Sequence, residues 1–165
     1  MLDISKLKKV DPNADNLKLI VPKNKGIYIW FSNETDDVIY IGTGSSDGGL
    51  YARIIGQHLR PAYIEYRAKV HSKVKDAYQL KHPIIRDRDG APGVDQSVFR
   101  RGIGRKYNIK PGEGTVDYIK NNLYLKFFEV DDKEELMILE KQLILKHSPL
   151  LNDKNNKYKI SNKLY

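Results

Sequence analysis

The segments GIYIWF at residues 26–31 and VIYIG at residues 38–42 decide the fold of this 165-residue chain. Both are rich in β-branched and aromatic residues, which favour extended strands. The six polar residues SNETDD at 32–37 separate them. Two such strands with a polar connection of this length predict a β-hairpin with a bulge or a longer loop.

A third strand and a long helix follow much later in the chain. The β-prone segment LYLKFFEV lies at residues 123–130, and residues 133–147, with Asp131 and Asp132 as N-caps, are typical of an α-helix. Further helical patterns fall at residues 50–59, 61–81, after an N-cap at Ser97, and 115–122, with a loop at 86–93. This order predicts an α+β fold, with a small three-stranded sheet, antiparallel or mixed, flanked by helices.

The length and composition indicate one domain over residues 1–165. The hydrophobic fraction of 40% supports a buried core, and the absence of cysteine excludes disulfides, thiolate metal sites and a cysteine nucleophile. No apolar run approaches the roughly 18 residues of a membrane span, and the N-terminus lacks a signal-peptide pattern. We therefore expect a cytoplasmic protein without membrane contact, ending in a short polar tail from about residue 153.

The charge is distributed unevenly along the chain. The formal net charge is +8. Residues 60–110 contain 13 basic and 5 acidic side chains, whereas residues 1–59 contain 7 of each and residues 111–165 contain 9 of each. A basic segment favours a polyanionic partner, and a solvated surface face is the alternative.

Glu140 has an unusual position in the predicted helix 133–147. It lies among the apolar residues Leu136, Leu139, Leu143 and Ile144 at helical spacing. A carboxylate on the inward face of a helix costs several kcal/mol unless it is paired or binds a metal. Glu140 is therefore either a structural residue with a buried arginine or tyrosine partner, or a metal ligand.

Four other polar residues fit ordinary structural roles when each is taken alone. Arg53 lies near the apolar side of a short helix, where an arginine stem can cover the edge of a core. Tyr28 and Tyr40 occupy strands that favour tyrosine, and His58 lies near a helix end.

The common order of these residues resembles the GIY-YIG nuclease superfamily. The matching pieces are GIY at 26–28, YIG at 40–42, Arg53, His58, E-x-x-L-I at 140–144 and P-x-L-N at 149–152. The resemblance covers residues 25–60 and 123–153 and leaves a helical basic insert, about residues 60–120, outside the common core. The pieces SVFRR at 97–101 and 117–136 look like a stand-alone prokaryotic branch of the superfamily, similar to restriction endonucleases.

The resemblance implies a metal-dependent endonuclease that hydrolyses phosphodiester bonds. It implies that Glu140 holds one Mg²⁺ or Mn²⁺ ion and that Arg53 holds the scissile phosphate. Tyr28 would act as the general base, with a pKa lowered by the metal and Arg53, and Tyr40 would be its hydrogen-bonded partner. The residues alone do not separate the two tyrosines.

The resemblance also implies that His58 binds phosphate or carries a proton and that Asn152 braces the site. This chain departs from the superfamily pattern in two places. Thr43 follows the YIG triplet, where many members have lysine. The step from Arg53 to His58 is five residues, which on a regular α-helix turns His58 well away from Arg53.

We expect the basic insert to bind the nucleic acid, because arginine and lysine can hold phosphates or, for arginine, a guanine edge. The expected contacts are Arg60, Arg67, Lys73, Arg86, Arg88, Arg100, Arg101 and Arg105. The expected substrate is DNA, with RNA as an alternative, and the protein is expected to be a monomer or a homodimer. A restriction or mobile-element role is favoured. A structure-specific repair or recombination nuclease, or an inactive nucleic-acid-binding module, is the alternative.

Overall fold

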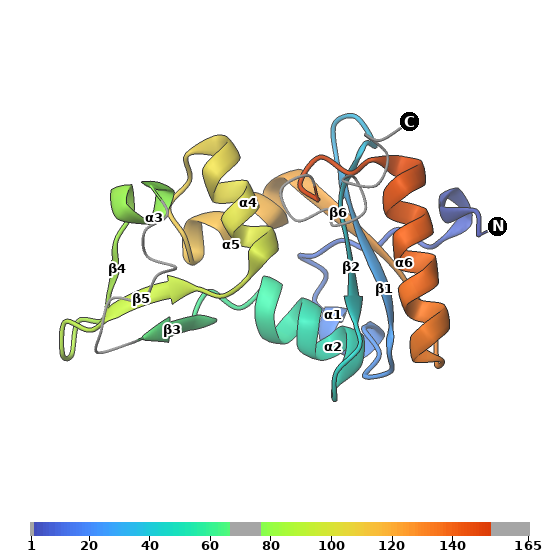
Figure 1. Cartoon of the computed structure of the whole chain (residues 1–165), viewed down its shortest axis with the longest axis horizontal. Coiled ribbons are helices and arrows are strands. Elements are labelled where there is room, and N and C mark those ends of the chain that lie inside the picture. The colour runs from blue at the N-terminus through green and yellow to red at the C-terminus, as the bar shows by residue number, and fades with distance from the viewer. Residues whose placement is uncertain (1, 67–76, 153–165) are drawn as a thin grey trace, which may run out of the picture. The chain divides into compact units, whose positions relative to one another are not determined.

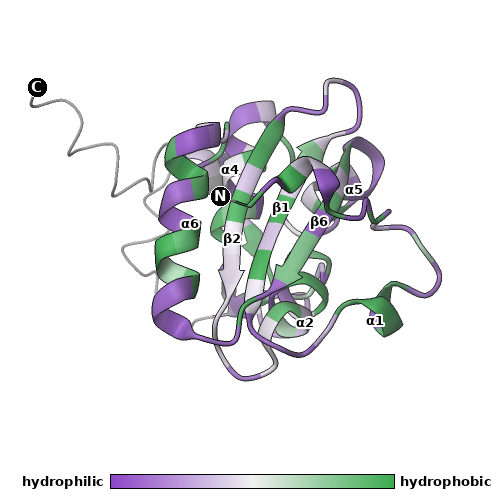
Figure 2. Cartoon of the chain, turned by 90° about the vertical axis from the view of Figure 1, so that its right-hand side faces the viewer, coloured by the Kyte–Doolittle hydropathy of each residue, from purple (hydrophilic) through white to green (hydrophobic). Residues whose placement is uncertain are grey.

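The structure, a computed structural model, describes residues 2–66 and 77–152, and its main element is a three-stranded antiparallel sheet in the order β2-β1-β6. The strands are β1 (Gly26–Ser32), β2 (Val38–Gly44) and β6 (Leu123–Glu129). The central strand β1 pairs with both neighbours. The three strands lie together in Figure 1, and their order can be followed in Figure 2. The predicted hairpin, third strand and α+β class are confirmed, and the sheet is antiparallel throughout.

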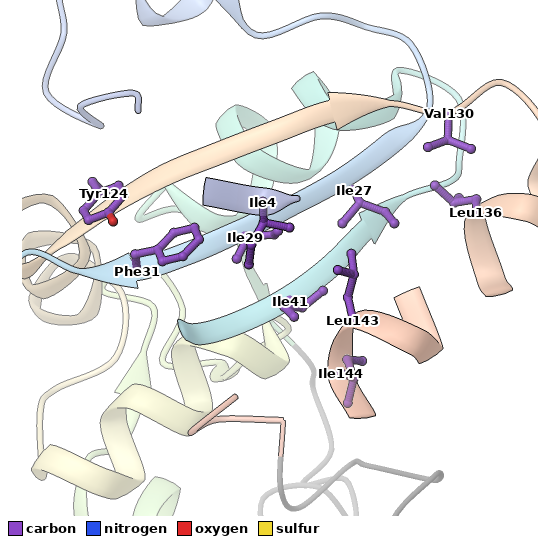
Figure 3. Close-up of a cluster of buried hydrophobic side chains, with 10 residues drawn as sticks. All are labelled: Ile4, Ile27, Ile29, Phe31, Ile41, Tyr124, Val130, Leu136, Leu143 and Ile144. Atoms are coloured by element: carbon purple, nitrogen blue, oxygen red, sulfur yellow. The ribbon is translucent and has the colours of Figure 1, made fainter. Parts of the chain in front are cut away.

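One face of the sheet packs against the long helix α6 (Lys133–His147). Ile27, Ile29 and Ile41 from the strands meet Leu136 and Leu143 from the helix, as Figure 3 shows. The helix has its predicted bounds, and the predicted cap is confirmed because the Asp132 carboxylate accepts a hydrogen bond from Glu135 N at 2.7 Å. This packing fixes Glu140 relative to the strands that hold the two tyrosines.

Helix α6 runs beside β2, which is the edge strand next to it in Figure 2. The chain after α6 then lies along β2. Leu151 N donates to Ile39 O at 2.9 Å, and the side-chain amide of Asn152 pairs with the backbone of Ile41. These bonds occupy backbone groups of an edge strand, which would otherwise need water or another strand.

Helix α2 (Gly49–Arg53) continues directly into η2 (Ile54–His58), which is a π-helix. The predicted helix 50–59 is therefore present, but it changes type after Arg53. Leu50 and Ile54 are fully buried. Gly26 at the start of β1 permits this packing, because a Cβ there would lie 2.7 Å from Leu50 Cδ1.

The N-terminal segment contributes η1 (Ile4–Lys6) and α1 (Leu17–Ile20). Lys126 on β6 is buried against this segment, and its ammonium donates to Ile4 O at 3.1 Å and Ser5 O at 3.0 Å. These bonds compensate the buried charge of a lysine on the sheet.

A second, smaller antiparallel sheet has the order β3-β5-β4. Its strands are β3 (Ile64–Tyr66), β4 (Ile84–Ile85) and β5 (Pro92–Asp95). The sequence prediction of a helix from residue 61 is wrong for residues 61–66, which form a turn and β3, while 67–76 lie outside the described residues. The predicted loop 86–93 is also wrong at its end, because β5 begins at Pro92.

Three helices accompany this sheet: α3 (Ala77–Lys81), α4 (Val98–Tyr107) and α5 (Glu113–Asn122). The predicted cap of α4 is confirmed, since Ser97 Oγ accepts a hydrogen bond from Arg100 N at 3.2 Å. No helix in the part of the chain that the structure describes is long and apolar enough to cross a membrane.

Contacts divide the chain into two compact units. We call residues 1–55 and 119–165 the core unit and residues 56–118 the insert unit. This division lies within a few residues of the predicted boundaries between the common core and the basic insert.

Candidate active site

Tyr28 and Tyr40 form a hydrogen-bonded pair on one face of the main sheet. Tyr28 on β1 lies opposite Gly42 on β2, and Tyr40 precedes Gly42 by two residues, so the alternation of the strands directs both side chains to the same face. The ring centroids are 6.2 Å apart. The two phenols are hydrogen-bonded to each other.

Gly42 leaves the space that the Tyr28 ring occupies. A Cβ at this position would lie 2.5 Å from Tyr28 Cζ and 3.0 Å from Tyr40 Cε1. Any side chain here would therefore displace the buried Tyr28 ring, which is only 2% exposed. A steric requirement of the Tyr28 ring thus explains why the third residue of the YIG triplet is glycine.

Arg53 and Glu140 place opposite charges within electrostatic reach of both phenols. Arg53 ends α2, Glu140 lies in the middle of α6, and both side chains are half-buried. Arg53 lowers the pKa of Tyr28 and of Tyr40, whereas Glu140 raises both. Four elements of the core unit thus bring together four of the six predicted catalytic residues.

The pKa values of both tyrosines are raised. Burial raises the pKa of Tyr28 well above 10, and Tyr40 and Glu140 add to this. Burial also raises the pKa of Tyr40, and Glu140 adds to the effect. Arg53 lowers the pKa of Tyr28, as predicted from the sequence, but burial raises it by more.

The Glu140 carboxylate suits a hard divalent ion that takes only one or two ligands from the protein. In residues 2–66 and 77–152, no group of three histidine, cysteine or acidic side chains forms a metal-binding cluster. Mg²⁺ commonly uses one or two carboxylates and completes its shell with water and substrate phosphate. Glu140 is half-buried rather than fully buried, so its carboxylate keeps contact with solvent.

Asn152 acts on the backbone next to Tyr40. Its Oδ1 accepts from Ile41 N and its Nδ2 donates to Ile41 O, both at 2.9 Å. The amide thus replaces a neighbouring strand at the residue between Tyr40 and Gly42. This contact supports the bracing role that the resemblance implies for Asn152. Thr43, which replaces the common lysine, is half-buried on the same strand.

His58 is buried in the insert unit. It is 2% exposed, its Nδ1 lies 3.0 Å from Ser97 Oγ, and its ring meets Phe99 edge-on. The chain from Ile54 to His58 is a π-helix, so the α-helical geometry on which the expected position of His58 rested does not apply here. These contacts give His58 a packing role, and its catalytic role stays a prediction.

Arg100 is a structural residue, and its predicted contact with DNA is wrong. Arg100 and Asp95 are both 0% exposed and form an ion pair at 2.9 Å. The guanidinium also donates to Gln57 O at 3.2 Å, to Tyr63 O at 2.9 Å and to Arg60 O. Every side of the group is engaged inside the insert unit, so it has no surface to offer a nucleic acid. The sequence signal that could have revealed this role is Asp95, five residues before Arg100.

The other predicted DNA contacts differ in exposure. Arg60 and Arg88 are exposed, Arg86 and Arg105 are half-buried, and Arg101 donates through Nη1 to Asp95 O at 2.8 Å. Arg67 and Lys73 lie outside the described residues. The role of these seven residues, six arginines and one lysine, in DNA binding stays a prediction.

Comparison with known families agrees with the geometry. The family model described as the GIY-YIG catalytic domain matches residues 7–165. The match includes the four clustered side chains and the whole insert unit. A search of curated proteins gives no match.

Proposed function

Because the chain belongs to the GIY-YIG family, whose domain indicates a nuclease, we propose that it is a metal-dependent endonuclease that hydrolyses DNA phosphodiester bonds. The observation that carries this proposal is the meeting of Tyr28, Tyr40, Arg53 and Glu140 in the core unit. These side chains supply a proton acceptor, a cation for the phosphate and a carboxylate for a metal.

Arg53 binds the scissile phosphate and offsets the negative charge that grows on it in the transition state. Its half-buried position suits this role, because the guanidinium is partly desolvated yet can reach a ligand. Glu140 holds Mg²⁺ or Mn²⁺, which would polarise the phosphate and offset the carboxylate charge that raises both tyrosine pKa values.

The tyrosine pair accepts the proton of the attacking water. The exposure of the two phenols favours Tyr40 as the acceptor, because Tyr40 is half-buried whereas Tyr28 is 2% exposed. Tyr28, its hydrogen-bonded partner, would then stabilise the phenolate. This assignment reverses the order of the two tyrosines given by the sequence prediction. Asn152 keeps the Tyr40 backbone in place through Ile41.

A restriction or mobile-element role is the form of this activity that we favour, because a separate basic unit accompanies the core unit within the same chain. A structure-specific repair or recombination nuclease would use the same chemistry on a different DNA. An inactive binding module is less well supported, because binding alone does not require a carboxylate beside a phosphate.

Cleavage of supercoiled plasmid DNA in Mg²⁺ tests the proposal. Wild type and Glu134→Ala, which changes an exposed carboxylate on the same helix, should nick or linearise the plasmid. Glu140→Ala should leave it intact while binding DNA normally in metal-free buffer. Equal cutting by Glu140→Ala would overturn the metal-ligand assignment. A wild-type protein that binds DNA but cuts none would establish the inactive-module alternative.

A further inference from the structure

A tight turn between β4 and β5 in the insert unit holds one arginine in a fixed orientation. Arg86 directly follows β4, and the turn is closed by Arg86 N donating to Ala91 O at 3.0 Å and Gly90 N donating to Arg86 O at 2.8 Å. Gly90 has a positive φ of 64°, which glycine adopts without strain. The backbone that carries Arg86 is therefore well defined.

Asp89 fixes one edge of the Arg86 guanidinium. Its carboxylate accepts from Arg86 Nε at 2.9 Å and lies 2.8 Å from Nη2. Ala91 N also donates to Asp89 Oδ1 at 3.1 Å, which anchors the carboxylate to the turn. The bonds from Arg86 and Ala91 lower the pKa of Asp89, so it stays charged at neutral pH.

Tyr66 on β3 lies against the same guanidinium through its ring. The Arg86 Cζ lies 4.9 Å from the centroid of the Tyr66 ring, which is a cation–π stack. Both side chains remain accessible, with 37% of the Arg86 side chain and 38% of Tyr66 exposed. Arg86 thus has one edge and one face held by the protein while it stays open to a ligand.

A guanidinium has five N–H groups. The two bonds to Asp89 use Nε–H and one hydrogen of Nη2. The opposite end, formed by Nη1 and the second Nη2 hydrogen, presents two donors in one plane. This fork matches the O6 and N7 acceptors of guanine in the major groove, the commonest specific contact of arginine with DNA. A pre-oriented fork loses less side-chain entropy on binding.

The charge of the turn favours a base over a phosphate as the acceptor. Arg86, Asp87, Arg88 and Asp89 carry two positive and two negative charges, so the turn has no net charge to attract a phosphate backbone. Arg88 lacks the arrangement of Arg86, since its side chain is 81% exposed and only a 3.9 Å approach links it to Asp89. Arg88 is therefore a natural control in the same turn.

We propose that Arg86, oriented by Asp89 and Tyr66, reads a guanine edge in the DNA substrate. The inference rests on the proposed function, because it takes DNA as the ligand. It goes beyond that function by assigning sequence selectivity to the β4–β5 turn of the insert unit rather than to its total charge.

Selection of duplexes from a library with a 20-base-pair random region tests this inference, using the full chain in buffer with EDTA. We expect wild type to enrich a guanine at one position. Arg86→Lys keeps the charge but loses the fork, and should lower affinity for the best selected duplex by about tenfold or more. Arg88→Lys and Tyr66→Phe, which keep the fork and the stack, should retain the guanine preference.

Asp89→Asn gives a second readout that simple unfolding would not produce. Removing one negative charge should raise affinity for unselected duplexes, while loss of the guanidinium clamp should weaken the guanine preference. The inference is overturned if wild type selects no guanine, or if Arg86→Lys selects the same sequences with the same affinity. It is also overturned if Arg86→Ala lowers the affinity for all duplexes equally and reduces the salt dependence of binding, because that result would indicate a phosphate contact.

These results are independent of cleavage, because no metal is present. A guanine preference that depends on Arg86 in a protein that never cuts DNA would support the inference while contradicting the nuclease proposal. Cleavage in Mg²⁺ without such a preference would support the nuclease proposal while contradicting the inference.

Discussion

The two units of the molecule each contain a cluster of charged and polar side chains, and the clusters differ in how their charges are held. In the insert unit, Asp95 and Arg100 are completely buried, and the arginine also bonds to three backbone carbonyls. In the core unit, Arg53 and Glu140 are half-buried on separate helices and act on the pair of buried Tyr28 and half-buried Tyr40.

This difference separates a structural role from a catalytic one. A guanidinium engaged on every side stabilises the chain segments around it and has no capacity left for a ligand. Half-buried charges beside the two phenols can bind a phosphate and a metal ion. Burial of a charged residue therefore does not identify an active site, whereas partial burial of opposite charges around titratable groups is a better guide.

Removal of Arg100 should break the structural cluster and give the largest effect. Arg100→Met leaves the Asp95 carboxylate buried without its partner, which should lower the unfolding free energy by about 3–5 kcal/mol. Urea unfolding monitored by circular dichroism measures this change. The exposed control Arg88→Met should change it by less than about 0.5 kcal/mol. An unfolding free energy of Arg100→Met within about 1 kcal/mol of the wild-type value would contradict the structural role.

Removal of Arg53 should affect cleavage far more than stability. Arg53→Ala should reduce the rate by about 10²–10³-fold, because it removes a charge that stabilises the transition state. Arg53→Lys should recover only part of the rate, since lysine lacks the planar fork. Single-turnover plasmid cleavage gives both values. A lysine variant as fast as wild type would show that the position needs only a positive charge.

Replacing each tyrosine in turn separates the proton acceptor from its hydrogen-bonded partner. Tyr40→Phe should lower the cleavage rate by about 10²-fold, and Tyr28→Phe should lower it less. Since both pKa values are raised above 10, more phenolate forms as pH increases, so the wild-type rate should rise between about pH 7 and 9. Rates of both variants across this range provide the comparison. A larger loss in Tyr28→Phe would restore Tyr28 as the base.

His147 should show the smallest effect, on stability alone. Its Nε2 is buried without a hydrogen-bond partner among the described residues, and burial lowers the pKa of this histidine below 6.5. The unfolded chain therefore binds a proton first, and stability should fall as pH decreases below about 6.5. Urea unfolding at two pH values, compared with His147→Gln, measures this contribution. An identical pH dependence in the variant would assign the effect to other groups.

The core unit follows closely from the sequence because its elements have strong local signals. These are the β-branched and aromatic residues of β1 and β2 and the capped apolar stripe of α6, and the motif order located the four clustered side chains. The shift of helix type at Ile54 could not be predicted, because the residues of a π-turn resemble those of an α-helix.

The insert unit was less predictable for two physical reasons. Its strands are short, and the spacing of Tyr63 and Tyr66 is the same as that of residues on one face of a helix. Strand β3 instead forms because it pairs with β5, about thirty residues later in the chain, and local sequence does not reveal such a pairing. The burial of Arg100 depends on carbonyl groups some forty positions away in the sequence. Composition indicated only that the segment is basic, and it could not separate a buried arginine from an exposed one.

The most direct test of the contrast between the two clusters is Glu140→Gln, measured for plasmid cleavage and urea unfolding on the same preparation. We predict that cleavage falls by about 10³-fold or more, because the metal loses its carboxylate ligand, while the unfolding free energy stays within about 1 kcal/mol of wild type. Cleavage at the wild-type rate, or a loss of cleavage that merely follows unfolding, would contradict the catalytic role of the core cluster.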